Sequence, residues 1–253
     1  MDAGSTGVSG TGRGPSGVVV VSGTGTEIGK TVVTAAIAAA AVAAGRSVAV
    51  LKPAQTGVGP DEPGDAAEVA RLAGAGVITR ELARYPEPLA PDTAARRSGL
   101  ATVGPAEVAE AAGKLAAEHD LVLVEGAGGL LVRFDEAGNT LADAARLLRA
   151  PVLLVVPAGL GTLNSAALTG EALRARGLTG LGLVVGSWPT APDLASRCNL
   201  ADLPAVSEMP LLGAVPHASG SLTPAAFRAA APGWLAPDLG GDWSAADFLR
   251  AWS

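Results

Sequence analysis

The sequence predicts a single α/β domain whose largely parallel sheet is covered by helices on both faces. Short, almost uninterrupted apolar runs alternate along the chain with helical runs, which is typical of strands buried on both faces. Segments rich in glycine and polar residues follow several of these apolar runs. No internal repeat or change in composition marks a second domain, so residues 17–253 are predicted to fold as one unit.

The most informative stretch covers residues 18–34. Four valines typical of a buried strand precede Ser-Gly-Thr-Gly-Thr-Glu-Ile-Gly-Lys-Thr at residues 22–31, and an alanine-rich run predicts a helix over residues 31–44. A glycine-rich loop between a strand and a helix, ending in Gly-Lys-Thr, is typical of a phosphate-binding loop. In such a loop Lys30 reaches the β- and γ-phosphates, and the Thr31 hydroxyl binds Mg²⁺.

The glycine spacing of this loop departs from two known patterns. The usual phosphate-binding loop has its first glycine where this chain has Thr24, whereas here the glycine stands one place earlier, at Gly23. A Gly-x-Gly-x-x-Gly pattern would favour a dinucleotide, but here the third glycine comes one place late. The next strand also ends in Leu51 and Lys52 instead of an acidic ribose ligand. We therefore favour the phosphate-binding loop.

The remaining elements follow from apolar runs and turn residues. Further strands are expected at residues 47–51, 121–124, 152–156, 181–185 and 211–215. Helices are expected at residues 66–73, 105–118, 139–149, from the segment 159–164 to about residue 176, and at 224–230 and 244–251. Residues 52–57 and 85–92 are expected to be loops.

Charged side chains follow two of the predicted strands, at the ends where parallel sheets bind their ligands. Glu125 comes directly after Leu-Val-Leu-Val and is placed to hold the Mg²⁺ of a nucleotide. Lys52 is one of only three lysines in a chain that otherwise uses arginine, which favours a functional role over a surface position. Asp65 begins a helical run, where a helix N-cap is the alternative to a metal ligand. Thr56 is a weak signal by itself.

A second glycine-rich segment, Gly-Leu-Gly-Thr-Leu-Asn at residues 159–164, precedes a predicted helix. Its free backbone N–H groups suit a carboxylate or a phosphate, although a tight junction between strand and helix explains the spacing nearly as well. His119 and His217 lie far apart in sequence and lack a metal-ligand pattern. Cys198 has no partner and is interpreted as inert.

Composition narrows the possible functions. The formal net charge of −6 argues against nucleic acid or an anionic membrane surface as the main partner. A single cysteine excludes a disulfide framework within the chain and fits a reducing cytoplasm. No uninterrupted apolar run reaches membrane length. Residues 1–16, rich in Gly, Ser and Thr, are interpreted as a flexible extension and not as a signal peptide.

Four motifs, in this order, resemble the dethiobiotin synthetase family of the P-loop NTPase superfamily. They are Gly-Thr-Gly-Thr-Glu-Ile-Gly-Lys-Thr at residues 23–31, Lys-Pro-Ala-Gln-Thr-Gly at 52–57, Val-Glu-Gly-Ala-Gly-Gly-Leu-Leu-Val at 124–132 and Gly-Leu-Gly-Thr-Leu-Asn at 159–164. The resemblance extends from about residue 18 to residue 216 and includes Gly-Ser-Trp-Pro at residues 186–189. The family has the same longer spacing in its phosphate loop.

The resemblance implies a P-loop NTPase-like fold and an ATP-dependent cyclo-ligase of biotin biosynthesis. Members join diaminopelargonate and CO₂ through a carbamate and a carbamic-phosphoric anhydride, giving dethiobiotin, ADP and phosphate. The resemblance also implies a cytoplasmic homodimer whose sites lie close to the subunit interface. Lys30 and Lys52 match catalytic residues of the family, and Thr31, Asp65 and Glu125 match its Mg²⁺ ligands.

The remaining site residues also come from the resemblance. Matches to nucleotide-binding positions are Glu27, Ile28, Gly29, Lys30, Thr31, Val32, Asp65, Glu125, Gly126, Ala127, Gly128, Gly186, Ser187, Pro216, His217 and Ala218. Matches to substrate-binding positions are Thr56, Gly159, Leu160, Gly161, Thr162 and Asn164.

One departure concerns the base of the nucleotide. Many members carry Asn-Asp, which helps to read adenine, where this chain has Gly186 and Ser187. We therefore expect loose selectivity among nucleoside triphosphates, because a pocket rejects an analogue strongly only when its own buried polar groups lose their partners.

Three other functions are alternatives to a synthetase. Partitioning ATPases carry an additional lysine where this chain has Gly25, and cobyrinate-type amidating enzymes need a glutaminase domain for which this chain is too short. A nucleotide-binding switch without synthetase activity is the alternative from a different class.

Overall fold

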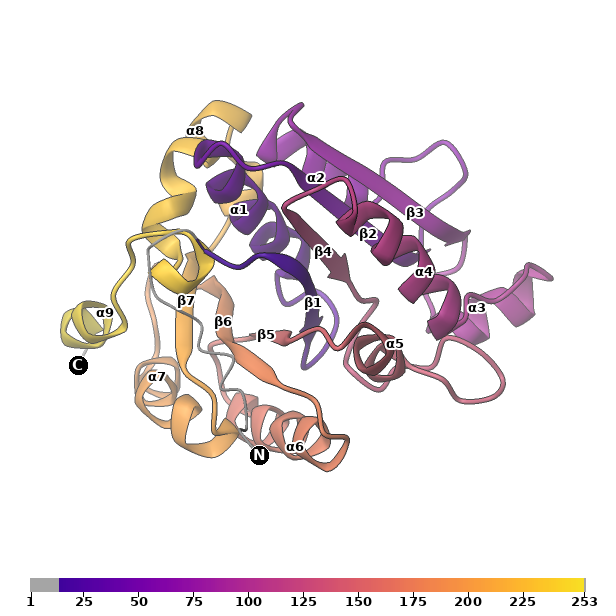
Figure 1. The fold of residues 1–253 in the computed structure, drawn as a ribbon. Coiled ribbons are helices and arrows are strands. Elements are labelled where there is room, and N and C mark those ends of the chain that lie inside the picture. The colour runs from indigo at the N-terminus through magenta and orange to yellow at the C-terminus, as the bar shows by residue number, and fades with distance from the viewer. Residues whose placement is uncertain (1–13, 253) are drawn as a thin grey trace, which may run out of the picture.

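The computed structural model describes residues 14–252 (Figure 1). Most of the extension predicted over residues 1–16 therefore lies outside the described residues. Residues 14–16 have no regular secondary structure. A Cβ atom added to Gly14 would lie 2.9 Å from the backbone nitrogen of Gly240, so the described chain begins in contact with the C-terminal part of the domain.

Seven strands of the described residues form one sheet in the order β3-β2-β4-β1-β5-β6-β7, and every neighbouring pair is parallel. The α/β class is confirmed, and the sheet, predicted to be largely parallel, is parallel throughout. The strands are β1 (Gly17–Gly23), β2 (Val48–Thr56), β3 (Val77–Tyr85), β4 (Leu121–Glu125), β5 (Val152–Val156), β6 (Gly180–Trp188) and β7 (Leu211–Pro216).

Helices cover both faces of the sheet, as predicted (Figure 1). On one face lie α1 (Lys30–Ala43), α2 (Asp65–Ala73) and α8 (Pro224–Ala230), and on the other lie α4 (Pro105–Ala116), α5 (Leu141–Leu148), α6 (Thr162–Ala175) and α7 (Leu194–Ser207). Two short helices, α3 (Pro91–Ser98) and α9 (Ala245–Trp252), lie at the periphery (Figure 1). The connections from β1 to β2 and from β2 to β3 run toward one edge of the sheet, and the later connections run toward the other edge. Because parallel crossovers are right-handed, the two groups of connections place their helices on opposite faces.

The core lies around the central strands and is built from small and branched side chains. The valines at positions 19–21 of β1 and all of β5 are essentially inaccessible to solvent. Residues 35–41 of α1, six alanines and Ile37, are buried as well, which places the backbone of this helix close to the sheet. With aromatic residues making up only 3% of the chain, close packing depends on this approach of backbones.

Two predicted loops form regular structure instead. Residues 52–56, predicted as a loop, continue β2 and pair with β3, which the sequence analysis missed. Pro53 lacks an N–H group, but it lies beyond Leu51, the last residue of β2 that pairs with β4, so no hydrogen bond on that side is lost. β3 has charged residues at intervals and no continuous apolar run, so its sequence does not predict a strand. It lies at the edge of the sheet and is half-exposed along much of its length. Residues 91 and 92 belong to α3 and not to a loop.

The C-terminal tail packs through aromatic rings. Phe248 and Trp252 of α9 contact Trp188 at the end of β6, and their ring centroids lie 5.2 and 5.6 Å from that of Trp188.

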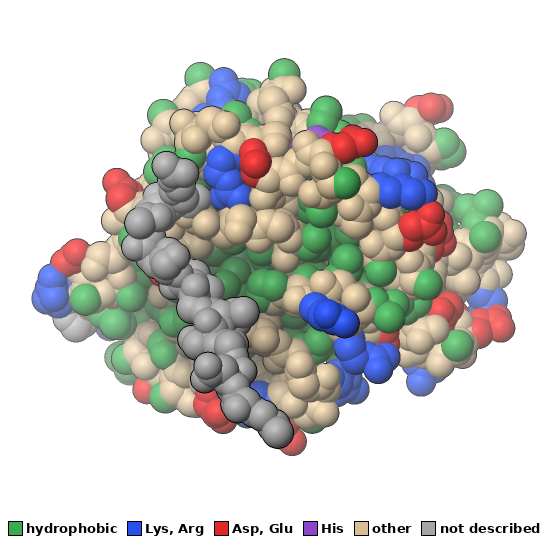
Figure 2. All heavy atoms as spheres, in the orientation of Figure 1, with side chains coloured by type: hydrophobic (Ala, Val, Ile, Leu, Met, Phe, Trp, Pro, Cys, Tyr) green, Lys and Arg blue, Asp and Glu red, His purple; other side chains and the backbone are tan. Residues whose placement is uncertain are grey.

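No helix within residues 14–252 is long and apolar enough to cross a membrane. On the face drawn in Figure 2, acidic and basic side chains are interspersed around a band of apolar side chains.

The loop after β1 touches the carboxyl end of β6 with almost no space between the backbones. A Cβ atom on Gly186 would lie 2.0 Å from the carbonyl oxygen of Ile28 and 2.6 Å from Cγ1 of Val155. A Cβ atom on Gly29 would lie 2.3 Å from the carbonyl oxygen of Gly186. Only glycine fits at these two positions, so the missing side chain at residue 186 has a packing reason.

Gly186→Ala is therefore expected to lower the free energy of unfolding by about 1–3 kcal/mol, the usual effect of forcing a methyl group into a filled space. Gly113→Ala in α4 is the matched control, since its Cβ atom would meet nothing within 4 Å. That change is expected to stabilise the protein by about 0.5–1 kcal/mol. Unfolding in guanidinium chloride measures the free energy of unfolding of both variants. Equal stability of Gly186→Ala and the wild type would contradict the packing described.

Candidate functional site

The loop between β1 and α1 has the geometry of an anion cradle. Gly29, the N-cap of α1, and Glu27 both have positive φ, 93° and 57°. No side chain caps the start of α1, which leaves its first backbone N–H groups for a ligand. The Lys30 ammonium donates a hydrogen bond to the carbonyl oxygen of Gly25 at 2.6 Å and so folds back over the loop.

A lysine between two carboxylates lies beside this loop. Lys52 of β2 is only 3% exposed, and its Nζ atom lies 3.0 Å from Oε1 of Glu125, the last residue of β4. It also forms an ion pair with Asp65, the first residue of α2, and donates to the carbonyl oxygen of Gly126 at 3.2 Å. Thr31 of α1 donates to the same Glu125 oxygen at 2.9 Å. Residues from four elements that are distant in sequence thus meet at one point.

Glu125 is the buried centre of this cluster. Its side chain is 1% exposed, and its second carboxylate oxygen, Oε2, is buried without a hydrogen-bond partner. A buried anionic oxygen without a partner is costly, so this position suits a cation. Within residues 14–252 no group of three or more His, Cys, Asp and Glu side chains could hold a metal by itself. The two carboxylates and the Thr31 hydroxyl therefore fit a cation that also takes oxygen atoms from a ligand, as Mg²⁺ does with phosphates.

The two lysines differ in charge behaviour. Burial, together with the neighbouring Lys52 ammonium, lowers the pKa of Lys30 from 10.5 to about 8. Burial acts in the same direction on Lys52, but Glu125 and Asp65 outweigh it and hold the pKa of Lys52 above its ordinary value. Lys52 is therefore a permanent cation, whereas Lys30 in the free protein loses its proton in mildly alkaline solution.

Asp65 is not a helix cap. The N-cap of α2 is Gly64, and no side chain caps this helix. The backbone N–H of Asp65 donates to Oε1 of Gln55 at 2.8 Å, while the Gln55 amide donates to the carbonyl oxygen of Thr56 at 3.1 Å. Gln55, which is buried, thus joins the start of α2 to the end of β2. Gln55 is not among the predicted site residues, because only its tertiary contacts distinguish it from a loop glutamine.

The glycine-rich segment after β4 packs against the phosphate loop. The backbone N–H of Gly126 donates to the carbonyl oxygen of Val21 at 3.0 Å, and Gly128 has a φ of 72°. A Cβ atom on Gly129 would lie 3.4 Å from the carbonyl oxygen of Gly23. Residues 126–128 are accordingly close enough to border the same cradle.

The predicted base-side residues also meet, at the carboxyl ends of β6 and β7. The Ser187 hydroxyl and Nδ1 of His217 are hydrogen-bonded at 3.1 Å. The backbone N–H of His217 donates to the carbonyl oxygen of Trp188 at 2.7 Å. Ala218 then turns the chain with a φ of 62°. Gly186 faces the phosphate loop and has no side chain, so of the two predicted base-side residues on β6 only Ser187 offers one.

The segment 159–164 is positioned differently. Leu160 is 91% exposed, and Gly161 is the left-handed N-cap of α6. The buried Thr162 hydroxyl has no hydrogen-bond partner. The side-chain amide of Asn199 on α7 donates to the carbonyl oxygens of residues 158 and 159 at 2.8 and 3.0 Å and so fixes the start of the segment. None of the hydrogen bonds or ion pairs described for residues 14–252 joins this segment to Lys52.

Comparison with known proteins identifies the family. Over 234 residues, 92% of this chain and 98% of the relative, the chain is 73% identical to the ATP-dependent dethiobiotin synthetase BioD of Streptomyces avermitilis. The chain belongs to the ATP-dependent dethiobiotin synthetase family. The protein of the same name from Saccharopolyspora erythraea is 67% identical over 227 residues, 90% of this chain and 99% of that protein. A family described as "AAA domain" matches residues 18–225.

Solved structures of low sequence identity share the fold. The septum site-determining protein MinD from Pyrococcus horikoshii, complexed with Mg-ADP, superposes with a TM-score of 0.56 at 18% identity, over 85% of this chain and 94% of that one. MinD of Aquifex aeolicus gives a TM-score of 0.52 at 13% identity, over 89% and 87% of the two chains. At this identity the likeness shows the P-loop NTPase-like fold of the synthetase chain and nothing about its reaction.

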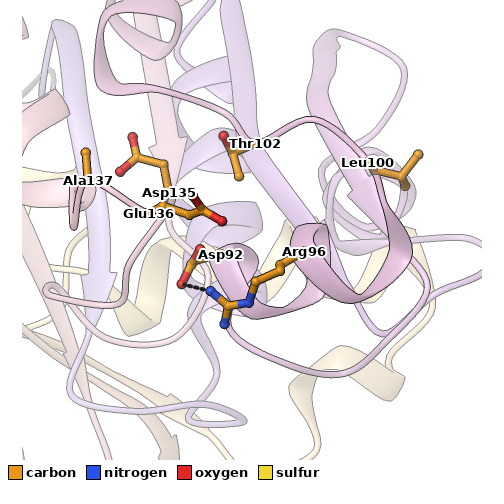
Figure 3. Close-up of a pocket in the computed structure, with 7 residues that line it drawn as sticks. All are labelled: Asp92, Arg96, Leu100, Thr102, Asp135, Glu136 and Ala137. Carbon is orange, nitrogen blue, oxygen red and sulfur yellow. Dashed lines mark hydrogen bonds and ion pairs between the residues drawn. The ribbon is translucent and has the colours of Figure 1, made fainter.

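A cavity of about 420 Å³ lies apart from the residues described so far (Figure 3). It is lined by Asp92, Arg96, Leu100, Thr102, Asp135, Glu136 and Ala137, none of which is a predicted site residue. Asp92 points toward Arg96, with which it forms an ion pair at 3.4 Å (Figure 3). Lacking the phosphate loop and the lysines, this cavity does not contain the chemistry of a nucleotide site.

The lowered pKa of Lys30 gives a prediction about proton uptake. A triphosphate stabilises the ammonium form, so at pH 8.5 its binding is expected to take up roughly half a proton or more per site, and close to none at pH 7. Calorimetry in buffers of different ionisation enthalpy measures this number. Lys30→Arg is the control, because arginine keeps its charge at both pH values. Equal uptake by the wild type and Lys30→Arg at pH 8.5 would contradict the assignment.

Proposed function

We propose that the chain makes dethiobiotin from diaminopelargonate, CO₂ and ATP at the carboxyl edge of its sheet, and that Lys52 is its central catalytic residue. The observation that supports this most strongly is the buried Lys52 between Glu125 and Asp65, next to the phosphate loop. A permanent cation there suits a reaction in which negative charge gathers on a carbamate and a transferring phosphoryl group.

The reaction begins when one amine of the substrate takes up CO₂ as a carbamate. A carbamate oxygen attacks the γ-phosphate of ATP, the bond to the β-phosphate oxygen breaks, and ADP leaves. The second amine then attacks the carbonyl carbon of the mixed anhydride and releases phosphate as the ring closes. Little covalent chemistry is required of the protein, whose contribution is to position the groups and neutralise charge.

Lys30 and Lys52 divide this work. The backbone of residues 27–32 and the Lys30 ammonium hold the β- and γ-phosphates, so Lys30 leaves its contact with Gly25 when the nucleotide binds. Lys52 exchanges part of its ion pairing with Asp65 for the carbamate and the γ-phosphate. Because Glu125 and Gly126 keep hold of the same ammonium, it stays in place during this exchange.

Thr31, Asp65 and Glu125 are the residues that would hold Mg²⁺. The unpartnered Oε2 atom of Glu125 is the feature that fits the ion, since a hard cation prefers charged oxygen ligands. When bound there, Mg²⁺ would supply positive charge that offsets the negative charge of the nucleotide. Asp65 pairs with Lys52 in the described structure and becomes available to the ion once the carbamate and the γ-phosphate take its place beside the ammonium.

The nucleoside is proposed to lie against Ser187 and residues 216–218. The hydrogen bond between Ser187 and His217 supports this placement, because it presents one short hydroxyl and an imidazole at the edge of the sheet beyond the phosphate loop. Gly186 contributes backbone only. Few buried polar side chains are available there to reject the wrong base, which is the basis for expecting loose selectivity among nucleoside triphosphates.

The diaminopelargonate carboxylate is proposed to bind the segment 159–164 of the partner subunit in a homodimer, with Thr56 contacting the amine end. The exposure of Leu160 supports an interface at this segment. Within the described residues, the hydrogen bonds and ion pairs of Lys52 do not involve residues 159–164 of the same chain, which also fits a role toward the partner subunit. The partly exposed Thr56, at the end of β2, lies at the same edge as Lys52. A cytoplasmic location is proposed with this biosynthetic role.

The assay for this function uses diaminopelargonate, bicarbonate, Mg²⁺ and ATP, with dethiobiotin detected by mass. Lys52→Ala is expected to lose turnover by a factor on the order of a hundred or more with little change in ATP affinity, because its charge acts on the transferring group. Lys30→Ala is expected to lose ATP affinity as well. Slow ATP hydrolysis that diaminopelargonate does not stimulate would instead indicate a nucleotide-binding switch, and wild-type turnover of Lys52→Ala would refute the role of Lys52.

The Mg²⁺ assignment is tested at Asp65. Asp65→Asn is expected to raise the Mg²⁺ concentration for half-maximal rate roughly tenfold, because an amide oxygen is a weaker ligand than a carboxylate. Asp61→Asn, four residues earlier in an exposed turn, is the matched control. Titration of the rate with Mg²⁺ at saturating ATP measures the effect. The same half-maximal concentration for Asp65→Asn and the wild type would remove Asp65 from the proposed ligands.

A further inference from the structure

We propose that Arg71 is a positioning residue that fixes residues 216–222 against the nucleoside and so sets the affinity for the nucleoside part of the nucleotide. The inference rests on the proposed nucleoside site at residues 216–218. Arg71 belongs to none of the four sequence motifs and lies on the outer surface of α2.

The contacts of Arg71 hold two elements together that are about 150 residues apart in sequence. Its Nη2 atom donates to the carbonyl oxygen of Gly220 at 2.6 Å, and its Nη1 atom donates to the carbonyl oxygen of Leu222 at 3.5 Å. Glu68, one turn earlier on α2, accepts from Nε and Nη2 of Arg71 at 2.7 and 2.6 Å. This two-point pairing sets the orientation of the planar guanidinium, which leaves its outer edge directed at the loop carbonyls.

The loop that Arg71 holds follows the nucleoside-side residues directly. Ala218 turns the chain with a φ of 62°, and the Ser219 hydroxyl donates to the carbonyl oxygen of Pro216 at 2.7 Å. A Cβ atom on Gly220 would lie 3.3 Å from Cγ2 of Val32, in the first turn of α1. The loop therefore lies between the nucleoside-side residues and the helix that follows the phosphate loop, and Arg71 closes it from the outside.

Helix α2 thus connects the two halves of the nucleotide site. Its first residue, Asp65, pairs with Lys52 on the phosphate side, and its seventh, Arg71, binds the loop on the nucleoside side. Arg71 lies six positions after Asp65, which places the two residues about 9 Å apart along the helix axis. Figure 1 shows α2 beside α1 and next to α8, so the helix that carries both residues is held on two sides.

This arrangement predicts a separable effect on two ligands. Loss of the Arg71 contacts frees residues 219–222 without touching the phosphate loop or Lys52. Binding of ATP must then order the loop, and its affinity falls, whereas inorganic triphosphate makes only the phosphate contacts and keeps its affinity. The surface ion pair with Glu68 is worth little for stability by itself, so the protein is expected to remain folded.

The experiment measures the dissociation constants of Mg-ATP and Mg-triphosphate by calorimetry for the full chain. For Arg71→Met we expect about tenfold weaker ATP binding and unchanged triphosphate binding, since hydrogen bonds from a charged donor are being lost. Arg146→Met is the control: Arg146 on α5 also pairs with an acid three residues earlier, Asp143, through a single contact at 3.3 Å, and α5 lies on the opposite face of the sheet from α2. Glu68→Gln is expected to weaken ATP binding in the same direction by a smaller factor. If Arg71→Met does not fold, Arg71→Lys, which cannot make the two-point pairing, replaces it.

Equal ATP affinity for Arg71→Met and the wild type, or an equal loss for ATP and triphosphate, would overturn the role of Arg71. Hydrogen exchange of the wild type distinguishes an error in the role of Arg71 from an error in the proposed nucleoside site. Protection of the amides of residues 217–222 by ATP, together with unchanged affinity in Arg71→Met, would refute only Arg71. Absence of that protection would refute the nucleoside site itself.

Discussion

The site depends on a buried ammonium group that must be neutralised. Lys52 is almost inaccessible to solvent, and without partners its charge would be lost or the fold destabilised by several kcal/mol. Glu125 and Asp65 supply the opposite charge, and each stands at an element end that the parallel sheet brings to the same edge. In the proposed reaction this ammonium exchanges its contact with Asp65 for oxygen atoms of the substrate and the phosphate, and Asp65 becomes available to Mg²⁺.

The close packing of the sheet positions the loop that borders this charge cluster. Because the core is made of alanine, valine and leucine, backbones approach each other closely, and the phosphate loop rests directly on Gly186. The same close approach explains why residue 186 carries no side chain that could read a base. The proposed phosphate cradle has uncapped backbone N–H groups at the start of α1, whereas the proposed nucleoside side depends on a short loop that Arg71 contacts at the surface.

Local pattern predicted the α/β class, six of the seven strands and the meeting of Lys52, Glu125 and the phosphate loop, because apolar runs and glycine spacing are local signals. The sequence does not predict β3, since an edge strand with alternating charges has no buried run, and residues 52–57, predicted as a loop, continue β2 as far as residue 56 because they pair with β3. Gln55, Asn199 and Arg71 acquire their roles only through partners distant in sequence, which no spacing reveals. Roles for Asp65 and for the segment 159–164 came from family resemblance and not from local chemistry.

The central claim is that Lys52 exchanges a carboxylate partner for the reacting groups. A crystal structure with Mg²⁺, a non-hydrolysable ATP analogue and diaminopelargonate tests it most directly. The account predicts that the Lys52 ammonium lies within hydrogen-bonding distance of the γ-phosphate, that its ion pair with Asp65 is broken, and that Thr31, Asp65 and Glu125 surround the metal. A complex in which Lys52 still pairs with Asp65, and the metal is bound elsewhere, would contradict it.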